Sequence, residues 1–293
     1  MPTELALGTW AFAGNFGFWS DQERSDSLKT LHYAIRNGIT SFDTAASYGN
    51  GKAEQMLGQQ LKRFPLKRSD LFIATKTMGN DSLETSLHRL CMEYVDLWYL
   101  HWPSHSKDCK QILSQMASEK KAKDIGICNA DVPFLKTLRD LPIRYVQIPC
   151  SLLWVRDMEE IKAYCKEKTI KLIGYSPTGM GVLSGTHDDP PEDSRATLYC
   201  YQHKTELSSL LDTLKEIARN HQTIPSVIAL SWALSQGFDQ IILGARKKGQ
   251  LEEDLNAKDI RLNDGEQTEL NSMANRLSAC ADPKQDNLFG HRW

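Results

Sequence analysis

The 293-residue sequence lacks the features that mark membrane or nucleic-acid-binding proteins. It has no uninterrupted run of about 18 apolar residues, and its start, Met1 to Gly8, shows no basic segment followed by a long apolar stretch. Asp and Glu slightly outnumber Lys and Arg, and the net charge of −2 leaves no excess positive charge for a phosphate backbone or an anionic membrane. We therefore expect a cytoplasmic protein with neither a membrane nor a nucleic acid as its partner.

Cysteine spacings typical of metal sites or redox motifs are also missing. The seven cysteines are an odd number, with no C-x-x-C pair and no zinc-like spacing. They are Cys91, Cys109, Cys128, Cys150, Cys165, Cys200 and Cys280. This pattern predicts free thiols in a reducing compartment and no bound metal.

Short apolar runs alternate with longer segments of helical periodicity, which is typical of parallel strands joined by helices. The predicted strands are Leu5–Thr9, Ile39–Asp43, Leu71–Lys76, Val95–His101, Asp124–Cys128, Tyr145–Ile148, Lys171–Tyr175 and Gln240–Leu243. Eight strands are the number that closes a barrel, and the length suits one α/β barrel domain over residues 1–293. An open doubly wound sheet also fits the alternation, but no G-x-G-x-x-G follows the first strand, which disfavours a Rossmann domain.

Between these strands the sequence predicts helices and one long insert. The clearest helix begins near Asp81, with Asp81 or Ser82 as its N-cap and an apolar stripe along one side. That stripe comprises Leu83, Leu87, Leu90, Cys91 and Tyr94. The overlong insert Ser176–Gly237, whose second part looks like two helices, is expected to cover a site. From Asn263 we expect a final helix, followed by a polar tail.

Four polar residues lie at or just after the ends of neighbouring predicted strands: Asp43, Tyr48, Lys76 and His101. Singly, each has an ordinary structural explanation, such as a turn or a solvated strand end. Together they can converge, because barrel enzymes assemble their sites from the carboxyl ends of several strands.

The chemistry of these four residues suits carbonyl reduction, in which a hydride reaches carbon and a proton reaches oxygen. Tyr48 is the candidate acid, and a neighbouring Lys76 is expected to lower its pKa from about 10. Asp43 would keep Lys76 charged and in place. His101 would orient the carbonyl oxygen or, in some conditions, donate the proton.

The chain resembles the aldo-keto reductases. The family's early motif is matched by Phe42-Asp43-Thr44-Ala45-Ala46-Ser47-Tyr48-Gly49, then Glu54 and Leu57-Gly58. Similar segments continue through Gly8-Thr9-Trp10, Leu100-His101-Trp102, Gly126-Ile127-Cys128-Asn129, Gly174-Tyr175-Ser176-Pro177 and Gly244-Ala245-Arg246. The resemblance implies a (β/α)₈ TIM barrel that reduces a small carbonyl compound with NADPH, using Asp43, Tyr48, Lys76 and His101.

The resemblance also implies a cofactor site. Asn129 and Gln147, with Cys128 beside them, would hold the nicotinamide carboxamide, and Tyr175 would stack on the ring. The loop from Ser176 to Leu183 would cradle the pyrophosphate, and Arg246 with Lys247 would meet the 2′-phosphate. The remaining cofactor-binding residues implied in this way are Thr9, Trp10, Pro177, Gly181, Gly244, Ala245, Gln250 and Asp254.

The chain departs from the family pattern in three places. Leu5 already lies in the first strand, so the N-terminal β-hairpin plug of most relatives is expected to be missing. Asp254 replaces a usual Asn, and its charge would oppose a nearby phosphate. The tail Ala281–Trp293 is short for closing over a substrate.

Two other functions are compatible with parts of the sequence. A non-catalytic redox sensor would bind the dinucleotide without turnover, which the complete tetrad disfavours. A metal-dependent hydrolase needs several His and carboxylate ligands at strand ends, where His101 is the only histidine. Aromatic residues expected near the site mouth, which suit an apolar pocket, are Trp10, Phe12, Trp19, Trp102 and Trp154. The substrate and the oligomeric state do not follow from the sequence.

Overall fold

The strands of the protein close into a barrel. The structure, a computed structural model, describes residues 4–13, 18–103, 108–185 and 189–280. All eight strands are parallel and pair in chain order, until β8 returns to pair with β1. They are β1 (Glu4–Gly8), β2 (Ser41–Asp43), β3 (Phe72–Thr77), β4 (Val95–Leu100), β5 (Ala122–Cys128), β6 (Ile143–Pro149), β7 (Lys171–Tyr175) and β8 (Gln240–Leu243). The predicted (β/α)₈ barrel is confirmed, and the open doubly wound alternative is wrong.

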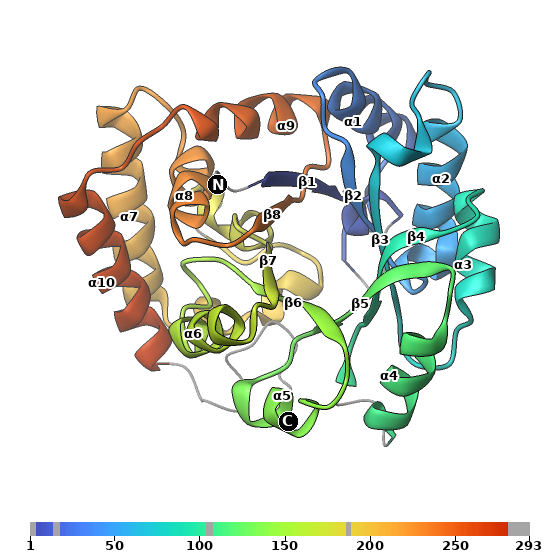
Figure 1. Cartoon of the computed structure of the whole chain (residues 1–293). Coiled ribbons are helices and arrows are strands. Elements are labelled where there is room, and N and C mark those ends of the chain that lie inside the picture. Colours follow the sequence, from blue (N-terminus) through green and yellow to red (C-terminus); the bar gives the residue numbers. More distant parts are fainter. Residues whose placement is uncertain (1–3, 14–17, 104–107, 186–188, 281–293) are drawn as a thin grey trace.

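Helices surround this barrel (Figure 1). They are α1 (Arg24–Arg36), α2 (Lys52–Leu61), α3 (Leu83–Leu90), α4 (Cys109–Ser118), α5 (Val132–Thr137), α6 (Met158–Lys168), α7 (Lys204–Asn220), α8 (Pro225–Ser235), α9 (Lys248–Leu255) and α10 (Asp264–Cys280). In the described part of the chain, no helix is both long and apolar enough to cross a membrane. None of the seven cysteines forms a disulfide, as the sequence predicted.

The core has two layers, because successive side chains of a strand point to opposite faces. The larger layer packs the outer strand faces against the helices and includes Phe42, Trp98 and Leu100. The smaller layer fills the barrel interior and consists of Ala6, Ala74, Leu97, Tyr99, Cys128, Tyr145, Ile173 and Ile242. Gly126 is required here, since a Cβ at this position would lie 2.5 Å from Cε1 of the Tyr99 ring. The barrel interior is therefore filled by side chains and is not an open channel.

The helix predicted from Asp81 exists but is shorter than expected. Ser82 is its N-cap and accepts a hydrogen bond from the backbone N of Thr85. Helix α3 ends at Leu90, because Cys91 adopts a left-handed conformation with φ of 56°. Cys91 is exposed and Tyr94 lies beyond the helix, so their predicted place on the apolar stripe is wrong.

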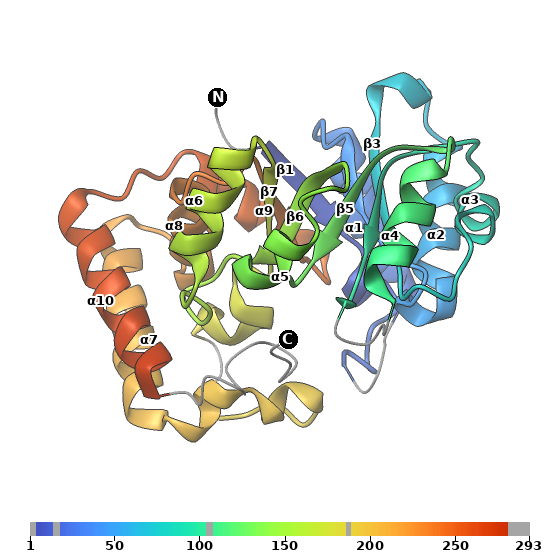
Figure 2. The same ribbon diagram turned by 60° about the horizontal axis from the view of Figure 1, so that its bottom comes forward.

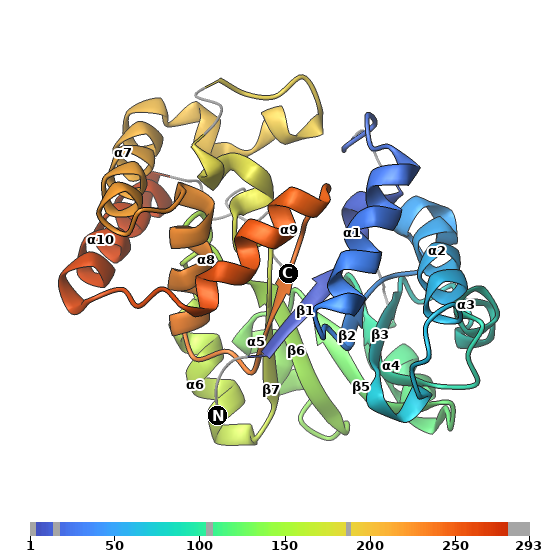
Figure 3. The same cartoon turned by 90° about the horizontal axis from the view of Figure 1, so that it is seen from above.

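The insert after β7 contains the two predicted helices, α7 and α8, preceded by short 3₁₀ turns. Figure 3 shows its first part at the same end of the barrel as the loop that follows β1. The predicted final helix is α10, whereas the tail Ala281–Trp293 lies outside the described residues. Within the described residues, β1 is the first strand, with no hairpin before it.

Candidate active site

The ends of β2, β3 and β4 bring three members of the predicted tetrad, Asp43, Lys76 and His101, to one end of the barrel interior. Leu97 and Tyr99 of β4 face inward, so His101, which is two residues further, faces the same way. On β3, Ala74 faces inward, so Lys76, which is two residues further, also faces inward. Asp43 is the last residue of β2 and hydrogen-bonds inside the barrel. Asp43, Lys76 and His101 are at most 9% exposed, so the barrel wall excludes most water from them.

Tyr48 comes from the turn after β2, which needs an unusual backbone. Gly49, Asn50 and Gly51 all have positive φ, with values of 55°, 54° and 87°. A Cβ on Gly49 would lie 2.4 Å from the Cβ of Ala13, so only glycine fits there. The turn sets the Tyr48 ring 6.2 Å from the Trp10 ring and 5.7 Å from the His101 ring, measured between centroids. Packing on both sides thus fixes the phenol.

Lys76 connects the members of the tetrad. Its buried ammonium forms an ion pair with Asp43 Oδ1. It also donates to the backbone oxygen of Thr44 at 2.9 Å and to Tyr48 Oη at 3.2 Å. These contacts use the three N–H groups of the ammonium, so Lys76 is held in one direction.

The electrostatics of the site differ from the sequence-based expectation. Burial lowers the pKa of Lys76, but the negative charge of the Asp43 carboxylate outweighs this effect and raises the pKa above its usual value, so Lys76 stays charged. For Tyr48, burial exceeds the lowering effect of the Lys76 charge and raises its pKa to about 12. The expected net lowering of the Tyr48 pKa by Lys76 is therefore wrong. Desolvation of the phenolate is the larger effect.

His101 is neutral at ordinary pH. Burial, and then the nearby charge of Lys76, lower its pKa well below the usual range. Its Nδ1 lies 3.5 Å from the Ser47 hydroxyl. A neutral imidazole carries one donor and one acceptor nitrogen, which allows it to orient a polar group.

Two side-chain amides predicted to hold the nicotinamide lie beside the tetrad. Asn129 accepts a hydrogen bond from the Tyr175 hydroxyl at 2.6 Å and donates to the His101 backbone oxygen at 3.2 Å. Gln147 donates to Asp43 Oδ2 at 2.9 Å, and its oxygen accepts a weak bond from the Cys128 thiol. Both amides are thus oriented by the protein, and each has a further N–H available for a ligand.

A pocket of about 990 Å³ joins these groups to the far rim of the barrel. Most of the predicted residues line it: Trp10, Asp43, Tyr48, His101, Asn129, Gln147, Tyr175, Ser176, Pro177, Gly181, Gly244, Arg246, Gln250 and Asp254. Of the aromatics predicted near the mouth, Trp10, Trp19 and Trp102 are in the lining.

Other predicted residues do not reach the pocket wall. Thr9, Lys76, Cys128, Leu183 and Ala245 are buried behind it. Thr9 instead secures the end of β2, by a hydrogen bond from its hydroxyl to the Asp43 backbone oxygen at 3.2 Å. Lys247 is exposed and lies outside the lining. The predicted aromatics Phe12 and Trp154 are buried and also lie outside the lining.

The far rim is organised around Arg246, which already has protein partners. Its guanidinium contacts Asp21 Oδ2 at 2.7 Å and Gln22 Oε1 at 2.8 Å. The Gln250 side chain accepts from the backbone N atoms of Arg246 and Lys247, at 2.9 and 3.1 Å, and so orders the start of α9. Asp254 is buried nearby, and burial together with the Glu253 charge raises its pKa to about 7.

Sequence reasoning missed three residues of this arrangement. Thr44 acts through a backbone oxygen, for which residue type gives no signal. Asp21 and Gln22 reach Arg246 across more than 220 positions of the chain, as the separation of 224 for Gln22 shows. The contact follows from the pairing of β1 with β8, which brings the loop after β1 close to the loop after β8.

Comparisons with known proteins agree with this geometry. Residues 4–275 match the aldo/keto reductase family model. The chain is 32% identical to the chloroplastic pyridoxal reductase of Arabidopsis thaliana, over 98% of this chain and 87% of the relative. It is 29% identical to the NADH-specific methylglyoxal reductase of Escherichia coli, over 94% and 95% of the two chains. The glycerol dehydrogenase of Gluconobacter oxydans shares the fold, with a TM-score of 0.80 at 24% identity over 96% and 94% of the chains.

The chain therefore belongs to the aldo-keto reductase family. It is a nicotinamide-dependent oxidoreductase that acts on carbonyl groups of small molecules.

Proposed function

We propose that the protein reduces an aldehyde or ketone to an alcohol with NADPH, and that Tyr48 delivers the proton. One observation carries this proposal: the ammonium of Lys76 donates its hydrogen bond to Tyr48 Oη at 3.2 Å. Because Tyr48 accepts from Lys76, its own hydrogen remains available for an oxygen in the pocket that Tyr48 lines.

The positive charge of the buried Lys76 then stabilises the phenolate that forms on Tyr48. A phenol whose pKa is about 12 keeps its proton at neutral pH until an oxygen with developing negative charge accepts it. The resulting phenolate lies beside the Lys76 ammonium, which Asp43 holds charged. Neutral His101, whose ring lies 5.7 Å from the Tyr48 ring, orients the carbonyl oxygen.

The donor set fits a nicotinamide cofactor. The amides of Asn129 and Gln147 offer complementary groups to a carboxamide, and Tyr175 lines the same part of the pocket. When bound, the reduced nicotinamide supplies the hydride. At the far rim, Arg246 offers a cation to the 2′-phosphate, which favours NADPH over NADH. One relative is named as NADH-specific, so the cofactor preference of this chain has to be measured directly.

We also propose that residues 1–293 act as one cytoplasmic domain, without a nucleic-acid or membrane partner. The redox-sensor alternative is not favoured. A protein that only binds a dinucleotide has no need of a buried lysine directed at a phenol.

A carbonyl panel tests the proposal. Purified protein with NADPH is given sugar aldehydes, short and aromatic aldehydes, ketones and dicarbonyls, including pyridoxal and methylglyoxal, and the loss of cofactor absorbance is followed. We expect turnover with at least one class. Tight NADPH binding without any turnover would contradict the proposal and support a sensor.

A further inference from the structure

A second group of chemically active side chains lies away from the pocket, between two outer helices. Helices α7 and α10 run side by side at one side of the barrel (Figures 1 and 2). His203 is the N-cap residue of α7, Glu206 lies in its first turn, and Cys280 is the last residue of α10. None of the three lines the active-site pocket.

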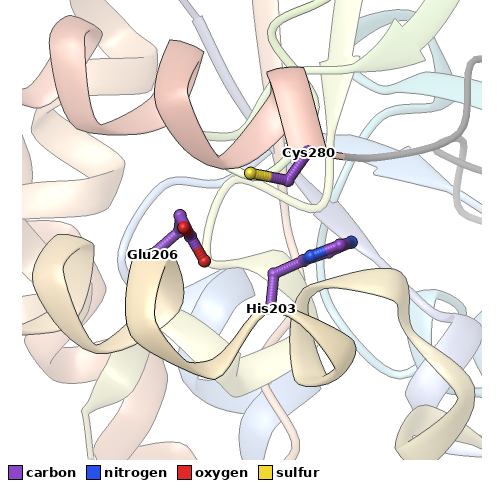
Figure 4. A group of neighbouring side chains, drawn as sticks. All are labelled: His203, Glu206 and Cys280. Carbon is purple, nitrogen blue, oxygen red and sulfur yellow. The ribbon is translucent and has the colours of Figure 1, made fainter.

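The three side chains turn their ligand atoms toward a common space (Figure 4). One nitrogen of His203, a carboxylate oxygen of Glu206 and Cys280 Sγ all lie within 4.8 Å of one another. In a tetrahedral zinc site, donor atoms are about 3.5 Å apart, given metal–ligand bonds of about 2.0 to 2.3 Å. Small side-chain rotations would close this difference, since Cys280 is exposed and His203 is only partly buried.

The polar atoms of this group are poorly satisfied by the protein. In the part of the chain that the structure describes, neither the His203 imidazole nor the Glu206 carboxylate has a hydrogen bond or an ion pair. Among the described residues, Cys280 Sγ donates only to the Arg276 backbone oxygen of its own helix, at 3.4 Å. Partly buried groups without partners stabilise a fold less than satisfied groups do, and a cation would satisfy all three together.

We propose that His203, Glu206 and Cys280 form a zinc site that links the start of α7 to the end of α10. Imidazole, carboxylate and thiolate are ligands of Zn²⁺, whereas the sulfur and nitrogen donors disfavour Mg²⁺ and Ca²⁺. The Cys280 thiol loses its proton on binding. Three protein ligands leave the fourth tetrahedral position for water.

Sequence spacing does not reveal this set. His203 and Glu206 are three residues apart, but Cys280 is contributed by the helix that packs beside them. The expectation that no metal is bound rested on spacing along the chain, which detects ligands only when they are near in sequence. The three residues lie outside the lining of the active-site pocket, so the proposed site does not rest on the proposed reductase activity.

Alkylation of thiols tests the site and contains its own control. Cys91 matches Cys280, because both are exposed, both lie at the end of a helix, and both thiols donate to a nearby backbone oxygen. The rate of modification of each cysteine is measured by mass spectrometry of the full chain, with zinc alone, with magnesium alone and with a chelator.

We expect micromolar zinc to slow the modification of Cys280 by about tenfold or more, and magnesium to have no effect. The rate at Cys91 should stay unchanged. In His203→Gln and Glu206→Gln, whose folding is checked by circular dichroism, the zinc protection of Cys280 should weaken by about tenfold. Equal zinc effects on Cys91 and Cys280, or full protection in both folded variants, would overturn the proposal.

Discussion

The two ends of the pocket are built differently. At the tetrad end, Lys76 is 1% exposed, and all three of its N–H groups have partners within the protein. At the Arg246 end, the Arg246 side chain is 21% exposed, and its guanidinium contacts an Asp21 side chain that is 72% exposed. A buried network is preorganised and strong, whereas a surface ion pair is worth little and is easily exchanged. The comparison indicates that the tetrad end is rigidly ordered, whereas the Arg246 end, where we propose that the 2′-phosphate binds, is more easily changed.

Replacing Lys76 should have the largest effect, because it removes the centre of the buried network. In Lys76→Met, turnover should fall by about 10² to 10⁴, since the phenolate left on Tyr48 loses its neighbouring cation. The single variant also leaves Asp43 buried without its ion-pair partner, which costs stability. The double variant Asp43→Asn, Lys76→Met should recover the thermal midpoint but not turnover. Recovery of turnover in the double variant would show that the fold, not the charge, was responsible.

Asp254 is a buried acid at the Arg246 end of the pocket, so removing its charge should stabilise the protein. Its folded pKa of about 7 exceeds the ordinary 3.8, so the folded state retains this proton to a higher pH than the unfolded state. Stability is therefore lost as pH rises from about 4 to 7. Asp254→Asn should raise the free energy of unfolding by about 2 to 4 kcal/mol at pH 8, and by almost nothing near pH 4. Chemical denaturation at both pH values measures this, with Glu269→Gln, an exposed acid on α10, as the control. A pH-independent difference would contradict the assigned cause.

Arg246 should set the preference for NADPH. A charged hydrogen bond to phosphate is worth about 1.5 to 3 kcal/mol, so Arg246→Ala should weaken NADPH binding by about tenfold or more and NADH binding far less. Lys247→Ala is the matched control, since Lys247 is exposed and outside the pocket lining. Titration by cofactor fluorescence separates the two residues. Equal loss of both cofactors in Arg246→Ala would exclude a role in binding the 2′-phosphate.

Asp21 should have the smallest effect and the opposite sign. Its carboxylate occupies the Arg246 guanidinium at 2.7 Å, so it competes with a phosphate for the same cation. Asp21→Asn should tighten NADPH binding about two- to fivefold and leave NADH unchanged, in keeping with the small worth of an exposed ion pair. The gain should shrink at high salt, which screens exposed charges. Weaker NADPH binding would show that Asp21 positions Arg246 rather than competing for it.

The sequence predicts the tetrad end much better than the Arg246 end. Asp43, Lys76 and His101 could be predicted because strand periodicity and parallel pairing bring inward residues to one end of a barrel. The raised pKa of Tyr48 could not, because it depends on how deeply tertiary packing buries the phenol. The contact of Asp21 and Gln22 with Arg246 joins opposite ends of the chain and has no local signal.

The most direct test of the account compares cofactor binding with turnover in Tyr48→Phe, which keeps the ring and removes only the hydroxyl. NADPH affinity, measured by fluorescence, should stay within a few fold of the unchanged protein. Turnover of the best carbonyl substrate should fall by about 10² to 10⁴, the usual contribution of a positioned acid. A variant that binds NADPH and still reduces its substrate at nearly the original rate would contradict the account and assign proton delivery to another group.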